Sequence, residues 1–188
     1  MLKSLSTLAM VTLTVGTSFA IPSFVSAEEI TCTGTLGAIT VDNVKVPQGR
    51  SCTLNGTTVK GNVVVNTGAI LKAVGAKVNG SIQAEGAAFV DVNSNSVVGG
   101  NVQIVQGRRA RVVSTRINAD LLYDSNSGAL VANNNTIGGN LQAFQNTGGV
   151  TIRRNRINGN LQCKENNPAP IGGGNIVNGS KEDQCARL

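Results

Sequence analysis

Apolar and polar residues along this chain alternate in short segments that recur with a fixed period. The phrase Gly-Asn-Leu-Gln occurs at 139–142 and again at 159–162, and related phrases begin at Gly61, Gly80, Gly100, Ala119 and Gly179. Successive phrases begin about 20 residues apart, and a repeat of this length predicts a solenoid, in which each repeat is one structural unit stacked on the next.

Aligning the repeats places apolar residues in three columns. The first column is Val44, Val63, Ile82, Val102, Leu121, Leu141 and Leu161, the second is Val46, Val65, Ala84, Ile104, Tyr123, Ala143 and Cys163, and the third is Val59, Val78, Val98, Ile117, Ile137, Ile157 and Val177. Because side chains alternate between the two faces of a strand, these columns indicate short strands that face one narrow core. The intervening Gln83, Gln103, Gln142 and Gln162 are expected to point outward.

The pattern predicts an all-β fold in which the chain coils in one direction. Glycine and asparagine recur too often for a stable helix interior, and the regular return of near-identical turns favours coiling over an antiparallel meander. We therefore expect a single-stranded, right-handed parallel β-helix of about seven turns, with a rise of about 4.8 Å per turn. Residues 28–41 precede the clear repeats and are expected to cover the N-terminal end as a lid.

Residues 1–27 have the features of a secretory signal peptide. Lys3 gives a basic start, an apolar stretch follows over residues 8–24, and Val25-Ser26-Ala27 is a small-residue cleavage site. A retained membrane anchor is the weaker interpretation, because threonine, glycine and Pro22 interrupt the apolar stretch. We expect residues 28–188 to form the mature domain, secreted or associated with the cell wall, with no further membrane-spanning segment.

Four cysteines follow the signal peptide, two at each end of the repeats: Cys32, Cys52, Cys163 and Cys185. An even number of cysteines in an exported protein indicates disulfides, and the absence of histidine and of Cys-x-x-Cys spacing argues against a metal site. Four thiols allow three pairings. Their placement favours Cys32–Cys52 and Cys163–Cys185, which would cap both open ends of the solenoid.

A column of amides accompanies the apolar columns. Asn135, Asn155 and Asn175 occupy one position in three successive turns. Each side chain is expected to hydrogen-bond to its neighbours above and below, which is a structural role.

The repeated Gly-Asn-Leu-Gln turns, the asparagine column and the paired terminal cysteines resemble small secreted bacterial proteins of the pectate-lyase-like, right-handed parallel β-helix superfamily. The resemblance covers roughly residues 40–180 and implies an architecture. It implies no single activity, because that superfamily includes lyases, hydrolases and adhesins.

The charge pattern gives the one candidate binding surface. The chain has a formal net charge of +6, and arginines cluster at 108–116 and 153–156. Arg116 and Arg156 fall in one outward column, with Lys77 further along it. Guanidinium groups on a rigid ladder suit the phosphates or carboxylates of a linear polymer. The candidate polyanion-binding residues are Arg109, Arg111, Arg116, Arg153, Arg154 and Arg156; a solvated basic face without a ligand is the alternative.

Candidate catalytic chemistry is sparse. Without histidine the chain has no Ser–His or Cys–His nucleophile. Glu85 and Asp124 share an outward column about 9.6 Å apart, near the outer limit for an inverting glycosidase pair, but no other motif supports them.

The sequence therefore favours a non-enzymatic, monomeric protein with a structural, adhesive or envelope-polymer-binding role and no cofactor. A polysaccharide lyase or glycoside hydrolase is the first alternative, and a subunit that assembles end to end is the second. Nucleic acid is a poor candidate partner because aromatic residues are few.

Overall fold

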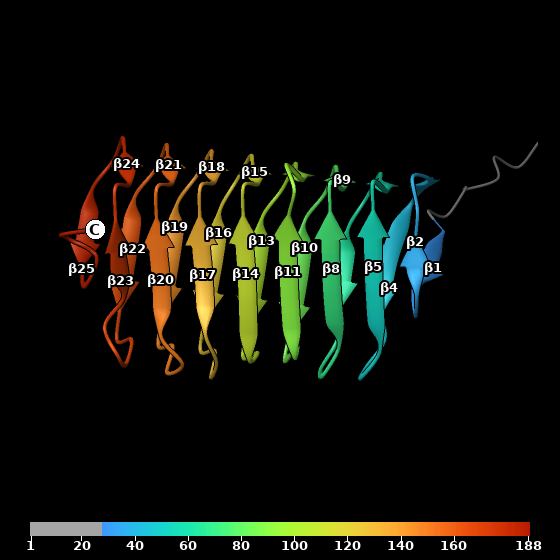
Figure 1. Cartoon of the computed structure of the whole chain (residues 1–188), viewed down its shortest axis with the longest axis horizontal. Coiled ribbons are helices and arrows are strands. Elements are labelled where there is room, and N and C mark those ends of the chain that lie inside the picture. The colour runs from blue at the N-terminus through green and yellow to red at the C-terminus, as the bar shows by residue number, and fades with distance from the viewer. Residues whose placement is uncertain (1–27) are drawn as a thin grey trace, which may run out of the picture.

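The computed structural model describes residues 28–188, and they form a parallel β-solenoid of about seven turns (Figure 1). Each complete turn contributes one strand to each of three parallel sheets, which we name A, B and C, and no helix occurs within residues 28–188. The predicted signal peptide, residues 1–27, lies outside the described residues.

The sheets run the length of the molecule. Sheet A contains β1 (Glu29–Thr31), β4 (Asn43–Val46), β7 (Val63–Val65), β10 (Ile82–Glu85), β13 (Val102–Val105), β16 (Leu121–Asp124), β19 (Leu141–Phe144), β22 (Leu161–Lys164) and β25 (Lys181–Asp183). Sheet B contains β2 (Thr35–Leu36), β5 (Ser51–Asn55), β8 (Ile70–Val74), β11 (Phe89–Asn93), β14 (Arg109–Val113), β17 (Leu130–Asn133), β20 (Val150–Arg153) and β23 (Ile171–Gly173). Sheet C contains β3 (Thr40–Val41), β6 (Thr58–Val59), β9 (Lys77–Val78), β12 (Val97–Val98), β15 (Arg116–Ile117), β18 (Thr136–Ile137), β21 (Arg156–Ile157) and β24 (Ile176–Val177).

The predicted apolar columns form the core, and sheet B supplies further inward residues such as Leu71 and Ile152. All members of the predicted columns are buried except Val177, which is partly buried at the C-terminal end. Parallel pairing keeps equivalent residues in register, as Ile104, Tyr123 and Ala143 show on adjacent strands. Each turn thus covers the apolar side chains of its neighbours.

The asparagine column is confirmed and is hydrogen-bonded along the stack. The backbone N–H and the Nδ2–H of Asn135 both donate to Oδ1 of Asn155, each at 3.0 Å. Asn155 donates in the same way to Oδ1 of Asn175. The other Nδ2–H of Asn155 donates to the Ala132 carbonyl at 2.8 Å. This arrangement satisfies the buried backbone at the corner between sheets B and C.

A second asparagine ladder, which we did not predict, fills the corner between sheets A and B. Asn126, Asn146 and Asn166 repeat the same hydrogen-bonding pattern one turn apart. Gln184 ends this ladder, because its Oε1 accepts the backbone N–H of Asn166 at 2.9 Å and the Nδ2–H at 3.0 Å.

The Gly-Asn phrase that defines the period forms a third ladder, at the corner between sheets C and A. Oδ1 of Asn140 accepts the backbone N–H of Asn160 at 2.8 Å, and Oδ1 of Asn160 accepts that of Ser180 at 2.9 Å. A side chain at Gly159 would collide with Oδ1 of Asn140. Glycine therefore precedes the asparagine because the amide of the turn below occupies the space that a Cβ would need.

Both predicted disulfides are present, Cys32–Cys52 and Cys163–Cys185. At the C-terminal end, the segment after β25 folds over the core and partly buries Leu188. At the N-terminal end, the segment expected as a lid is part of the solenoid itself. Residues 29–41 form β1, β2 and β3, which pair in parallel with β4, β5 and β6. They cover the core as a short first turn because they continue all three sheets.

Tyr123, the only tyrosine, gives a testable pH dependence. Its side chain is buried, its hydroxyl donates to the Val131 carbonyl at 2.9 Å, and burial raises its pKa well above the usual value. In the unfolded chain the Tyr123 hydroxyl ionises near pH 10, whereas in the folded chain it stays protonated at that pH. The stability that this difference provides is therefore complete below pH 10 and is lost as the pH rises above it. We expect the free energy of unfolding to fall by about 1.4 kcal/mol per pH unit above pH 10.

Urea unfolding at pH 9, 10, 11 and 12 measures this slope. Tyr123→Phe is the matched control, since it keeps the ring and cannot ionise. Equal slopes for the parent protein and for Tyr123→Phe would show that Tyr123 does not cause the alkaline loss.

Candidate functional site

The structure divides the six candidate arginines between two sheets. Arg109 and Arg111 lie on β14 in sheet B, and Arg153 ends β20 in the same sheet. Arg116 and Arg156 lie on β15 and β21 in sheet C. Arg154 occupies the corner between these sheets. The candidates therefore do not form one face.

The arginines of β14 have partners within sheet B. Nη1 of Arg111 donates to Oδ1 of Asp91 on the adjacent strand at 3.0 Å, and the Asp91 side chain is only 16% exposed. The Arg109 guanidinium carbon lies 5.3 Å from the centroid of the Phe89 ring, a cation–π contact. Arg111 is therefore paired with a carboxylate, and Arg109 lies against an aromatic ring.

The cations of sheet C lie in one column. Lys77 pairs in register with Val97, Val97 with Arg116, Arg116 with Thr136, and Thr136 with Arg156. Lys77, Arg116, Thr136 and Arg156 are exposed. In Figure 1, β15, β18, β21 and β24 follow one another along one edge of the solenoid. We call Lys77, Arg116, Arg153, Arg154 and Arg156 the basic surface.

No carboxylate balances the basic surface within the described residues. None of the strands of sheet C contains an acidic residue, and none of the four ion pairs between residues 28 and 188 involves a side chain of the basic surface. Asp120, at the neighbouring corner, accepts hydrogen bonds from the backbone N–H and Nδ2–H of Asn140. The cations therefore face solvent as unpaired charges.

The surface is hollowed beside Arg116. A depression of about 410 Å³ lies between sheet C and the corner that precedes it; it is lined by Asn95, Val97, Ser114, Thr115, Arg116, Asn134 and Thr136. The corner residues Asn95, Ser114, Asn134 and Arg154 have φ between 50° and 59°. This left-handed conformation costs a non-glycine residue roughly 1–2 kcal/mol. The depression combines a guanidinium with amide and hydroxyl groups, which suits a hydroxyl-rich anion.

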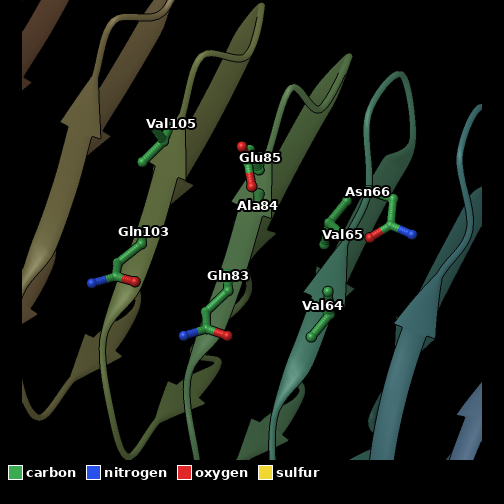
Figure 2. A pocket seen from close by; sticks show the side chains of 8 residues that line it. All are labelled: Val64, Val65, Asn66, Gln83, Ala84, Glu85, Gln103 and Val105. Atoms are coloured by element: carbon green, nitrogen blue, oxygen red, sulfur yellow. The ribbon is translucent and has the colours of Figure 1, made fainter.

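A further depression lies on sheet A and is lined mainly by uncharged residues. Its volume is about 520 Å³, and Val64, Val65, Asn66, Gln83, Ala84, Glu85, Gln103 and Val105 line it. Figure 2 shows Gln83 and Gln103 side by side on adjacent strands, with Glu85 further along the strand of Gln83. Glu85 is the only charged residue in this lining.

The two candidate carboxylates do not share a depression. Glu85 pairs in register with Val105, and Val105 with Asp124, so one strand separates them as expected. Asp124 instead lines a separate depression of about 330 Å³, with Phe144, Gln145, Lys164 and Glu165. The Val105 side chain stands between the carboxylates, an arrangement that does not hold one substrate between an acid and a base.

Comparisons with protein-family models, with curated proteins and with solved structures give no match for this chain. Within residues 28–188 no group of three or more cysteine, aspartate or glutamate side chains is placed to hold a metal ion. The same part of the chain has no helix that could cross a membrane. The fold and the surfaces described above are therefore the basis for a functional proposal.

Proposed function

We propose that this chain is a non-enzymatic, secreted or cell-surface solenoid that binds an anionic polymer through the basic surface. One observation carries the proposal: the basic surface gathers five cations without an ion pair, beside and within a sheet that has no acidic residue. Exposed guanidinium groups on a fixed scaffold bind carboxylate, sulfate or phosphate groups by charge-assisted hydrogen bonds.

The location is part of the proposal. Disulfides persist in oxidising compartments, so Cys32–Cys52 and Cys163–Cys185 are consistent with an extracellular protein. A signal peptide over residues 1–27 would deliver the domain there. We also propose kinship with the secreted pectate-lyase-like β-helix proteins, supported by the parallel solenoid and by the asparagine ladder. An acidic polymer of the cell envelope would then lie within reach of the basic surface.

The test is the affinity of the purified protein for immobilised acidic polysaccharide across a salt series. We expect binding that weakens as salt rises, because exposed charges are screened. Arg116→Gln with Arg156→Gln should weaken binding by up to roughly thirtyfold, since each of the two exposed ion pairs contributes up to about 1 kcal/mol.

The matched control is Arg109→Gln with Arg111→Gln. This variant lowers the net charge equally, but it alters arginines of sheet B that already have protein partners. Equal weakening in both double variants would mean that net charge alone drives retention, and the basic surface would not be a site. Salt-independent or negligible binding by the parent protein would remove the proposal altogether.

A further inference from the structure

The column of sheet C alternates between cations and uncharged side chains over six strands. Its members, in order, are Lys77, Val97, Arg116, Thr136, Arg156 and Ile176. Neighbouring strands of a sheet lie about 4.8 Å apart, so successive cations are about 9.6 Å apart.

The shape of sheet C fixes the direction of a bound polymer. Each of its strands is two residues long, and one of these two residues faces the core, as Ile117 and Ile157 do. A strand therefore offers one outward side chain, and the outward face of sheet C is one side chain wide and many strands long. A linear ligand that contacts several of these cations must run along the solenoid axis, across the strands.

The spacing selects the charge density of the ligand. One sugar residue advances a linear polysaccharide by about one strand spacing, so alternate sugars would face the cations. At physiological ionic strength the Debye length is about 8 Å, shorter than the distance between successive cations. Each cation therefore acts as a separate site. An anion on every sugar would place half of the charges opposite Val97 and Thr136, which cannot neutralise them.

We infer that the ligand is an acidic polysaccharide with one anionic group per disaccharide, bound along the solenoid axis by Lys77, Arg116 and Arg156. Thr136 is exposed between two of these cations and can hydrogen-bond to a hydroxyl of the intervening uncharged sugar. A nucleic-acid strand fits this column less well, since it carries a phosphate on every nucleotide and therefore an anion on every unit. The inference rests on the proposed function and specifies its ligand.

A charge-conserving exchange tests the spacing. The double variant Thr136→Arg with Arg156→Thr moves one cation to the strand next to Arg116 and leaves composition and net charge unchanged. Both positions are exposed and belong to the same outward column. An unchanged thermal unfolding midpoint would show that the exchange leaves the fold intact.

The probes are hyaluronan, which has one carboxylate per disaccharide, polygalacturonate, which has one per sugar, and single-stranded DNA, all compared at physiological salt and equal anion concentration. We expect the parent protein to bind hyaluronan about fivefold more tightly than polygalacturonate, the effect of roughly one exposed ion pair. The exchange variant should lose this preference.

The remaining outcomes separate the two proposals. The parent protein could bind both polysaccharides equally, and the exchange could leave this binding unchanged. If Arg116→Gln with Arg156→Gln nevertheless weakens it, the spacing inference is overturned and the proposed function is kept. Tighter binding of single-stranded DNA than of hyaluronan overturns the assignment to polysaccharide. Binding of none of the three probes overturns the proposed function and the inference together.

Discussion

Replacing Asn155 by alanine is expected to lower the free energy of unfolding by about 3–5 kcal/mol, because the change leaves buried polar groups in the middle of a ladder unsatisfied. Oδ1 of Asn155 accepts two hydrogen bonds from Asn135, and its Nδ2 donates to the Ala132 carbonyl. Alanine leaves two donors and one acceptor without these partners inside the protein. Each unsatisfied buried group costs about 1–3 kcal/mol.

The measurement is urea unfolding followed by far-UV circular dichroism, with the thermal midpoint as a second readout. For a domain of this size such a loss lowers the midpoint by roughly 10 °C. Asn158→Ala is the matched control: Asn158 is exposed and accepts one surface hydrogen bond from Asn178. We expect that control to change stability by about 0.5 kcal/mol or less.

A graded variant makes the test more specific. Thr115 occupies the equivalent position two turns earlier, where its hydroxyl donates to the Val92 carbonyl at 3.2 Å. Asn155→Thr can therefore restore the bond to the Ala132 carbonyl and should be less destabilising than alanine. If alanine and threonine destabilise equally, or if alanine costs no more than about 1 kcal/mol, the ladder does not contribute as we argue.

The fold could be predicted from the sequence because the repeat is regular where the core requires it. The first inward column uses only valine, isoleucine and leucine, from Val44 to Leu161, and the other two columns are also buried almost throughout. The alternation within strands and the placement of Cys52 and Cys163 at the two ends are also visible in the sequence, so the strands and the disulfides could be predicted. The strands within residues 29–41 were not predicted, because this segment lacks the Gly-Asn phrase, and yet it pairs in parallel with the first repeat.

The second ladder was missed although its signal is in the sequence. Asn126, Asn146 and Asn166 recur at the same interval as Asn135, Asn155 and Asn175. The preceding residues do not distinguish the two sets: Ser125, Gln145 and Glu165 are as dissimilar as Asn134, Arg154 and Gly174. Ser125, Gln145 and Glu165 have φ between 52° and 57° and turn the chain at the corner between sheets A and B. A search for asparagines that recur every 20 residues or so would have found both ladders.

The division of the arginines could not be predicted by grouping them along the chain. Arg111 and Arg116 belong to one turn, but a corner lies between them and places them on different sheets. Arg116 and Arg156 are two turns apart and share a column, as the aligned repeats predicted. In a solenoid, the position within the turn decides which side chains meet, and the turn number decides only how far apart they are. The depressions depend on side-chain packing and left no sequence signal that we recognised.

Removing the C-terminal disulfide is the other change with a large expected effect. Cys163→Ala with Cys185→Ala should lower the free energy of unfolding by about 3 kcal/mol, because the bridge closes a sequence separation of 22 and restricts the unfolded chain. The loss should also loosen the C-terminal segment in the folded state. Cys185 anchors the segment that carries Gln184, and Gln184 satisfies the last member of the second asparagine ladder.

Limited trypsin digestion with mass spectrometry distinguishes these two effects. In the variant lacking Cys163–Cys185 we expect cleavage after Lys181, which lies on the terminal strand β25, at a protease concentration that leaves the parent protein intact. Cys32→Ala with Cys52→Ala is the matched control, since it opens a bridge of similar separation at the other end. That control should lose similar stability in urea while Lys181 stays protected.

Early cleavage at Lys181 in both variants would indicate that the whole solenoid unfolds as one unit. Protection in both variants would show that the strand pairing of β25 with β22 alone holds the end closed.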